Sequence, residues 1–289
     1  MKHIPVLTSE VLQYLNPKEN ENFIDCTVGQ GGHTALILEK NKPNGKVLGI
    51  DLDPQQIENC KLTIKNDRLL LVNDSYANLK EIVEKNNFEK IDGILLDLGM
   101  SSWQLEGTTK GFSFQKDEEL DMRYDTAQTL TAEIIVNEYS KENLEKIIEE
   151  YGEEGFAKQI VKKITEERKI KKIESTLQLV EIIKKAVPTK FQHGNIHCAT
   201  RTFQALRIAV NNELENLKSV LPQVISILSS GGRIVIISFH SLEDRIVKNF
   251  FKEENSIKIL TKKPVMAGDE ELRLNSRSRS AKLRAFVRI

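Results

Sequence analysis

The sequence predicts an α/β fold, a mostly parallel sheet interrupted by a helical insertion. Between residues 23 and 97, short runs that are apolar on both faces alternate with helix-like stretches, which is typical of buried parallel strands in βαβ units. From about 131 to 187, apolar residues recur at helical spacing. A strongly apolar strand returns at 233–238. In a separate second domain this strand would lack parallel neighbours, so a single sheet domain that is interrupted by the insertion is favoured over two sequential domains. The predicted domains are residues 1–106 with 200–289, and the insertion 107–199.

Each predicted element follows from a local pattern. A capping box of Ser175 and Gln178 begins one helix of the insertion. A long helix over 203–228, broken near Pro222, leads to a turn at Gly231-Gly232. The strands are expected at 23–26, 46–51, 69–72, 94–97, 233–238 and, with weaker patterns, 257–261 and 283–289.

The composition excludes several classes of protein. The chain has 289 residues, with 42 Lys and Arg against 42 Asp and Glu, so a uniform polycation is excluded but local basic patches are not. The three cysteines, Cys26, Cys60 and Cys198, are too widely spaced for a disulfide framework or a cysteine zinc site. No apolar run approaches the ~18–20 residues that span a membrane, and no signal-peptide core follows Met1. We therefore expect a soluble, cytoplasmic protein with no membrane partner.

A glycine-rich turn follows the first strand, in the segment DCTVGQGGH at residues 25–33. Such a turn lets a ligand approach the backbone, and a helix N-terminus favours electronegative groups. The second strand ends in Asp51, whose carboxylate can accept both hydroxyl groups of a ribose. NAD, FAD and S-adenosylmethionine all fit such a unit. Thr34 stands where the dinucleotide fingerprint has its third glycine, which favours S-adenosylmethionine over a dinucleotide or a purely structural turn.

Several longer motifs carry a family resemblance. They are DLGMSSWQ at 97–104, GFSF at 111–114, LDMR at 120–123, YGEE at 151–154, ATRTFQALRI at 199–208, ISFHSLEDR at 237–245 and RSRSAKLR at 277–284. In this order they resemble the RsmH (MraW) family, bacterial S-adenosylmethionine-dependent methyltransferases that modify the exocyclic N4 amine of a decoding-centre (P-site) cytidine in 16S rRNA. The resemblance runs from His3 to the C-terminus. It implies a class I methyltransferase fold, with a Rossmann-like, mostly parallel seven-stranded sheet and an inserted helical substrate-recognition domain.

The resemblance also implies where S-adenosylmethionine binds. All the implied contacts follow the first four predicted strands, where open α/β sheets bind their ligands. Tyr76 would offer a ring face to adenine, and Asp97 and Gln104 would place acceptors near the positive sulfonium. The implied cofactor contacts are Gly31, Gly32, His33, Asp51, Tyr76, Asp97 and Gln104.

The expected chemistry is an in-line displacement in which the cytosine amine attacks the sulfonium methyl group. An acceptor for the amine hydrogens stabilises the positive charge that develops, and positioning supplies much of the remainder. Asp97 is the candidate catalytic acceptor, and a role only in cofactor binding is the alternative. Methylation of a ring carbon would instead need a cysteine nucleophile, for which Cys198 is the candidate and an inert residue the favoured interpretation. Asp121 and Asp125 form no recognisable metal site, and we expect no metal.

RNA binding must come from local charge, because the whole chain is neutral. Residues 272–289 hold six basic residues and no acid, which favours RNA contact. The basic run over 158–172 is more typical of a solvated helix face. The candidates for RNA contact are Arg201, His240, Arg277 and Arg279, with a structural hydrogen-bonding role as the alternative for His240. The expected partner is 16S rRNA within the small ribosomal subunit or a late assembly particle, and a homodimer is a second partner that we consider.

Two rival functions are weighed against this one. A methyltransferase acting on DNA or a small molecule is the rival within enzymes, and the basic tail argues against a small substrate. A binding protein without catalysis is the other rival, and the intact glycine loop with Asp51 argues against it.

Four positions depart from the family pattern. Trp103 and Cys198 stand where the family usually has proline, Gly155 replaces an arginine, and Tyr124 replaces a methionine. Trp103 is the most consequential, because it neighbours the expected cofactor site. It is either a hydrophobic lid residue or a base-stacking residue.

Overall fold

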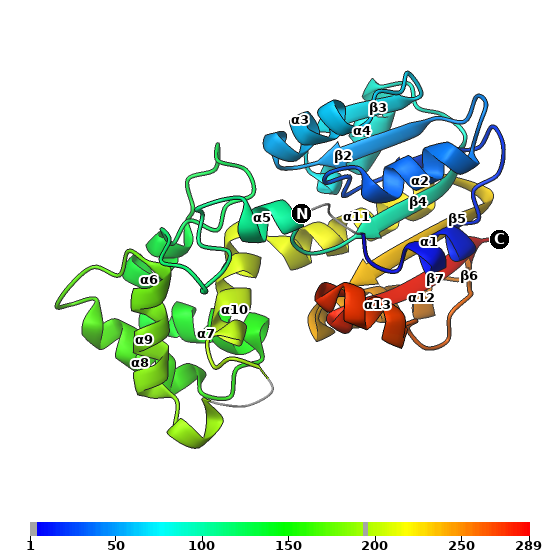
Figure 1. The fold of residues 1–289 in the computed structure, drawn as a ribbon. Coiled ribbons are helices and arrows are strands. Elements are labelled where there is room, and N and C mark those ends of the chain that lie inside the picture. The colour runs from blue at the N-terminus through cyan, green and yellow to red at the C-terminus, as the bar shows by residue number, and fades with distance from the viewer. Residues whose placement is uncertain (1–4, 193–195) are drawn as a thin grey trace. The chain divides into compact units, whose positions relative to one another are not determined.

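The computed structural model describes residues 5–192 and 196–289, so His3 and Ile4, where the family resemblance begins, lie outside the described residues. The chain divides into two compact units, Met1–Gly99 with Leu214–Ile289, and Met100–Glu213 (Figure 1). These boundaries differ from those expected after residues 106 and 199. One reason is that α10 (Thr200–Asn211) contributes buried apolar side chains to the core of the helical unit.

The first unit is built on a seven-stranded sheet in the order β3-β2-β1-β4-β5-β7-β6 (Figure 1). β1 to β5 are parallel, and β7 pairs antiparallel with both β5 and β6. The predicted α/β class with a mostly parallel, Rossmann-like sheet is therefore confirmed. The strands are β1 (Asn22–Asp25), β2 (Val47–Asp51), β3 (Leu69–Asn73), β4 (Ile91–Asp97), β5 (Leu228–Ser238), β6 (Ile257–Ile259) and β7 (Lys282–Arg288).

Buried apolar side chains cover both faces of this sheet, which explains why its central strands are apolar throughout. One face packs against α4 (Leu79–Lys85), α11 (Glu213–Ile227) and α12 (Ser241–Glu253), and the other against α1 (Thr8–Leu15) and α2 (Gly32–Lys40). The unit also contains α3 (Pro54–Thr63), α13 (Asp269–Leu274) and the 3-10 helices η1 (Tyr76–Asn78) and η3 (Ser276–Ser280). Among residues 5–192 and 196–289, no helix combines the length and the apolar character that crossing a membrane requires.

The parallel register brings three acids to one edge of the sheet. Asp25, Asp51 and Asp97 are the last residues of β1, β2 and β4. Parallel strands share their carboxyl edge, so the three carboxylates belong to the edge at which such sheets bind ligands.

The long helix expected over 203–228 is in fact two helices. Asn212 has a left-handed backbone with φ 52° and ends α10, and α11 begins at the next residue. Pro222 lies inside α11, so the predicted break near this proline is wrong. Asparagine adopts the left-handed conformation more readily than most residues, which makes Asn212 the natural stop. The turn expected at Gly231 is an irregularity within β5, where the pairing with β4 shifts and Gly231 has φ 79°.

The second unit is helical, as the periodicity predicts. Its core is formed by the apolar residues that recur at helical spacing, among them Leu144, Ile148, Ile160 and Ile164, which are fully buried. Only half of the predicted capping box forms, because Gln178 accepts the N–H of Glu174 rather than that of Ser175. The helices are α5 (Ser102–Glu106), α6 (Ala132–Glu138), α7 (Lys141–Gly152), α8 (Ala157–Glu167), α9 (Thr176–Ala186) and α10, with η2 (Thr189–Phe191).

Candidate functional site

The glycine loop joins β1 to α2 in a left-handed backbone conformation that favours glycine. Gly29 and Gly31 have φ of 50° and 82°, in the left-handed region. A Cβ atom on Gly31 would lie 2.4 Å from Ile64 Cδ1 and 2.8 Å from Cys60 Sγ, so the loop is packed tightly against the end of α3. Gly31 also caps α2 without a side-chain hydrogen bond. The loop therefore presents bare backbone at the start of a helix.

Asp51 is bound to this loop through its side chain. Its carboxylate accepts the N–H of Gly29 at 2.9 Å and the N–H of Asp53 at 3.0 Å. Burial raises the pKa of Asp51 from its ordinary value to about 7, although the two N–H donors favour the ionised form. The main-chain oxygen of Asp51 accepts the N–H of Asp74, which ties the end of β3 to the same place. The predicted ribose acceptor is thus oriented before any ligand binds.

Asp25 forms a second polar centre that the sequence analysis did not single out. It is buried, and its carboxylate accepts the hydroxyl of Thr34 at 2.7 Å and the N–H of Thr27 at 3.2 Å. Burial raises the pKa of Asp25, and these hydrogen bonds oppose the rise. Thr34 thus has a positive role besides replacing a glycine. An acid at a strand end, with a threonine in the first turn of the next helix, is the signal that could have identified the pair.

Asp97 is anchored to the same loop and faces His33. Its N–H donates to Thr27 Oγ1 at 2.7 Å, which fastens the end of β4 to the segment after β1. His33 Nε2 lies 3.5 Å from Asp97 Oδ2, with the His33 side chain 6% exposed and the Asp97 side chain 21% exposed. Asp97 Oδ1 and both ring nitrogens of His33 are buried and have no hydrogen-bond partner among the described atoms. The structure therefore brings these two predicted site residues together.

Tyr76 and Gln104 occupy different units. Tyr76 begins η1, three residues after the end of β3, and is partly buried against the core that contains β2 and β4. Gln104 belongs to the helical unit, where its side chain accepts the N–H of Ser101 at 2.9 Å and completes the capping box of α5. Its predicted contact with the cofactor stays a prediction.

The arginine-rich tail is divided between structural and exposed residues. Arg284 donates to Asp244 through Nε at 2.6 Å and Nη2 at 3.1 Å, and Arg288 Nη1 donates to the carbonyl of Leu228. These two arginines fasten β7 to α12 and to the start of β5. Arg277 and Arg279 lie in η3, and Arg279 is exposed. The basic charge of 272–289 is thus smaller at the surface than the sequence predicts.

The other two RNA-contact candidates also make internal contacts. Arg201 is exposed on α10 and donates to the carbonyl of Glu153 at 3.2 Å. His240 caps α12, since its Nδ1 accepts the N–H of Glu243 at 3.4 Å while Glu243 accepts the N–H of Phe239 at 2.8 Å. The hydrogen-bonding alternative weighed for His240 is therefore present, and its contact with RNA stays a prediction.

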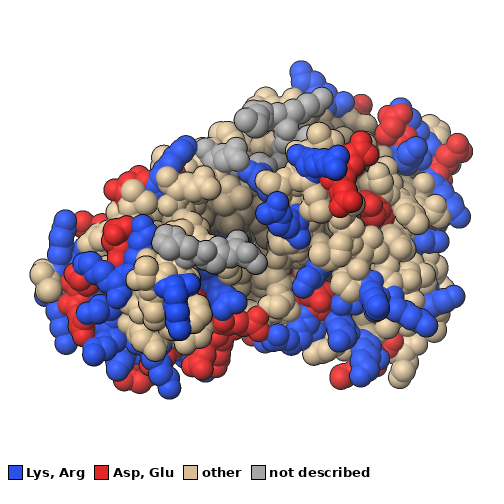
Figure 2. Space-filling view, turned by 60° about the horizontal axis from the view of Figure 1, so that its bottom comes forward, with Lys and Arg blue, Asp and Glu red and all other residues tan. Residues whose placement is uncertain are grey.

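The basic run over 158–172 is largely a paired helix surface. Lys163 lies 2.8 Å from Glu166, Lys172 is paired with Glu133, and other lysines of the run have acidic neighbours. Basic and acidic side chains are correspondingly intermingled on the face shown in Figure 2. This arrangement agrees with a solvated helix face.

Cys198, the candidate nucleophile, is buried, and so is Cys26. Cys198 is 9% exposed within the core of the helical unit, and burial raises the pKa of its thiol. Burial raises the pKa of the Cys26 thiol well above its ordinary value. A thiol that resists ionisation is a poor nucleophile, so the inert interpretation is favoured for both residues.

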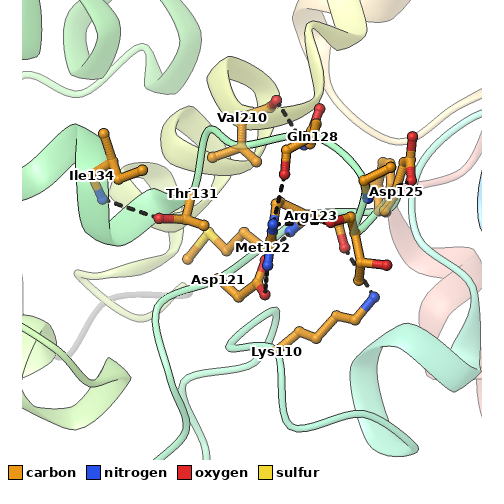
Figure 3. A network of polar contacts seen from close by, with 12 residues as sticks. Lys110, Asp121, Met122, Arg123, Asp125, Gln128, Thr131, Ile134 and Val210 are labelled. Atoms are coloured by element: carbon orange, nitrogen blue, oxygen red, sulfur yellow. Dashed lines mark hydrogen bonds and ion pairs between the residues drawn. The ribbon is translucent and has the colours of Figure 1, made fainter.

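Asp121 is committed to an ion pair. Arg123 donates to it through Nε at 2.7 Å and Nη2 at 2.9 Å, and its remaining nitrogen reaches main-chain carbonyls of the same loop, including that of Gln128 at 2.6 Å (Figure 3). Burial opposes ionisation of Asp121, but the hydrogen bonds from Arg123 outweigh it and hold the pKa below its ordinary value. The Asp121 carboxylate therefore serves to order the loop over 120–131.

Two of the departures from the family pattern have clear packing roles. The Tyr124 ring stacks on Phe112 with centroids 5.3 Å apart, and its hydroxyl lies 3.2 Å from Glu213 Oε1. Trp103 is partly buried and lies so close over Gly107 that a Cβ there would meet its ring at 2.6 Å. A Cβ on Gly155 would meet no atom within 4 Å. A side chain at this position would therefore extend into open space, and the glycine leaves no gap in the packing.

The strand order, with a reversed β7 between β5 and the edge strand β6, and the acids around the glycine loop define a Rossmann-like methyltransferase of class I. The chain belongs to the MraW methylase family, whose model matches residues 1–289. It is 49% identical to the ribosomal RNA small subunit methyltransferase H of Sulfurihydrogenibium sp. (strain YO3AOP1), over 100% of both chains. Identity to the protein of the same name from Thermotoga neapolitana is 48%, over 98% of this chain and 95% of the relative. An rRNA methylase structure from Streptococcus thermophilus aligns with a TM-score of 0.45 at 11% identity, covering 98% of this chain and 93% of the other.

Proposed function

We propose that this chain is an S-adenosylmethionine-dependent methyltransferase of 16S rRNA in the small ribosomal subunit. We propose further that it modifies the exocyclic N4 amine of a decoding-centre (P-site) cytidine. The observation that carries the proposal is membership of the MraW methylase family together with acids at the carboxyl ends of β1, β2 and β4 around a glycine loop. Such an enzyme would act in the cytoplasm, where its substrate is assembled.

The carboxyl edge of the sheet fits an adenosyl ligand. Asp51 would accept the ribose hydroxyls, and Tyr76 would offer a ring face to adenine. Gly31 and Gly32 would let the ligand approach the backbone, with Gln104 as a further contact. The unpartnered polar atoms of His33 and Asp97 support a site that is completed by a ligand, because burying such atoms alone is costly. When bound, S-adenosylmethionine supplies an electrophilic methyl group on its sulfonium.

Asp97 is the residue proposed to act on the amine. The lone pair of the cytosine amine is delocalised into the ring, so an acceptor must orient the amine and take its hydrogen as positive charge develops. The 21% exposure of the Asp97 side chain leaves it reachable, and its N–H bond to Thr27 fixes the backbone that carries it. No buried cysteine is needed for attack by an amine.

The helical unit and the exposed part of the tail are proposed to select the RNA. Arg277 and Arg279 would neutralise phosphates, and Arg201 on α10 is a further candidate. His240 would contribute through the loop that it caps rather than as a free side chain. A local basic surface suits this role in a chain whose net charge is zero.

Nucleoside mass spectrometry tests the proposed function. Purified small subunits that lack the modification are incubated with the protein and S-adenosylmethionine, and the 16S rRNA is digested. We expect N4-methylcytidine. 5-Methylcytidine would show ring-carbon chemistry instead, and methylation of DNA but not rRNA would identify another substrate class.

Calorimetry with S-adenosylmethionine and with NAD provides the second test. We expect heat only from the first ligand, because Thr34 and its bond to Asp25 occupy the place of the third glycine. Tight NAD binding with no response to S-adenosylmethionine would overturn the assignment of the cofactor.

A further inference from the structure

His33 carries a buried imidazole ring that no described residue satisfies. The ring is 6% exposed in the first turn of α2, and neither Nδ1 nor Nε2 has a hydrogen-bond partner. Buried polar groups are almost always paired, since leaving them unpaired costs free energy. Its Nε2 lies 3.5 Å from the carboxylate of Asp97, whose Oδ1 is also buried and unpartnered. Two unsatisfied groups from α2 and β4 therefore face each other.

We propose that His33 is a positioning residue that orients the Asp97 carboxylate toward the substrate amine, an inference that rests on the proposed function. Asp97 keeps 21% of its side chain exposed whereas His33 keeps 6%, so the carboxylate reaches the substrate and the imidazole supports it from within the protein. The N–H of Asp97 is already fixed by Thr27, but this bond leaves the side chain free to rotate. A hydrogen bond from Nε2–H to Oδ2 removes that freedom.

Nε2 and Oδ2 lie 3.5 Å apart, which is long for a hydrogen bond. Hydrogen bonds of catalytic groups are often long in the empty enzyme and shorten to about 2.6–3.2 Å when the substrate is bound. Small adjustments of the His33 and Asp97 side chains would suffice, because the two side chains are already within 3.5 Å of each other.

The step that this pair serves is a methyl transfer. As the nitrogen–carbon bond forms, the bond between the methyl group and sulfur breaks and its electron pair stays on sulfur. The nitrogen thereby acquires positive charge and loses one proton to the Asp97 carboxylate, which later releases it to water. His33 donates to the second carboxylate oxygen throughout and is itself neither protonated nor deprotonated.

This role requires an N–H donor on Nε2 and a carboxylate that can accept it. The charged groups that face His33 are Asp97 on β4 and Asp25 on β1, and Asp25 is already bonded to Thr34 and Thr27. Asp97 is therefore the carboxylate that His33 is placed to orient.

Two substitutions of similar size separate orientation from simple cofactor binding. His33→Gln keeps a donor near the position of Nε2, whereas His33→Leu removes the donor. At saturating S-adenosylmethionine and rRNA, we expect His33→Leu to lower kcat by about 10²-fold, the scale of a misplaced catalytic group. We expect His33→Gln to restore much of this kcat, because it keeps the donor. Calorimetry on each variant reports cofactor affinity separately, and we expect smaller losses there than in kcat.

Two results would overturn the inference. One is a loss of S-adenosylmethionine affinity that accounts for the whole effect, with kcat restored at saturation. The other is a folded His33→Gln variant whose kcat falls by the full loss of about 10²-fold although it keeps a donor, and this result decides even if His33→Leu does not fold. A wild-type protein that methylates another position would contradict the proposed function alone. The same comparison of kcat values, recorded on that product, would still decide the role of His33.

Discussion

Arg284 on β7 and Asp244 on α12 form a buried ion pair joined by two hydrogen bonds, with side chains only 8% and 16% exposed. The pair fastens the antiparallel strand at one side of the sheet to the helix that follows β5. An arginine held in this way is not available to a nucleic acid. The tail therefore contains residues with opposite expected behaviour on substitution.

Arg284→Ala should destabilise the sheet unit. Removing one partner of a buried pair leaves an uncompensated charge, and the expected loss in the free energy of unfolding is about 3–5 kcal/mol. Chemical denaturation measures it. A loss below about 1 kcal/mol, typical of an exposed pair, would contradict the structural role.

Replacing Arg277 and Arg279 together by Ala should weaken RNA binding while leaving cofactor affinity nearly unchanged. Each arginine that neutralises a phosphate adds about 0.7–0.9 to the slope of log affinity against log salt, so the slope should fall by up to about 2. Filter binding over a salt series measures this slope, and thermal melts check stability. An unchanged slope with a large loss of stability would assign both residues to structure.

The affinity for S-adenosylmethionine should depend on pH through Asp51. Burial raises the pKa of this carboxyl to about 7, so lowering the pH from about 8 protonates the ribose acceptor and weakens binding, by up to about tenfold per pH unit well below the pKa. Asp51→Asn should bind more weakly at high pH and lose this dependence. Calorimetry over the pH series measures both effects.

Asp51→Ala should cost about 1.5–3 kcal/mol of cofactor binding, the worth of hydrogen bonds to a charged group. The melting temperature should fall moderately, because the N–H groups of Gly29 and Asp53 lose their acceptor, but the protein should still fold. If affinity is unchanged while the melting temperature collapses, Asp51 supports the glycine loop and does not bind the ribose.

Thr34→Val should lower the free energy of unfolding by about 1.5–3 kcal/mol, because the buried Asp25 carboxylate loses its hydroxyl donor. The pKa of Asp25, already raised by burial, should rise further, so the loss should be greatest at high pH and smaller where the carboxyl is protonated. Thr63→Val is the matched control, since Thr63 is exposed and bonds only within its own helix end. Equal losses in the two variants would argue against the Asp25 bond.

Cys198→Ala should retain methylation, since an amine nucleophile needs no covalent bond to the enzyme. Burial raises the pKa of this thiol, which already disfavours its use as a nucleophile. Activity assays paired with cofactor calorimetry test the point. A variant that loses activity but still binds the cofactor would favour methylation of a ring carbon through Cys198 instead.

The sequence alone determined the central strands and two of the acids that end them. A strand buried on both faces must be apolar throughout, and a carboxylate is rarely tolerated there, so Asp51 and Asp97 each stand where a run stops, whereas Asp25 was expected inside a run that continued to Cys26. A parallel sheet has one carboxyl edge, and these acids therefore fall on the same side without knowledge of the packing. The glycine loop was equally readable, because left-handed backbone selects glycine locally.

Only the tertiary structure decided which charged and polar side chains are committed within the protein. Asp244 lies 40 residues before Arg284, and no local pattern distinguishes that arginine from the exposed Arg279. The contact between His33 and Asp97 is likewise set by how α2 and β4 pack around β1. Hydrogen bonds and ion pairs act over a few ångströms in space, whereas a sequence pattern reports only neighbours along one strand or helix. The role of such a side chain is therefore fixed when distant segments meet.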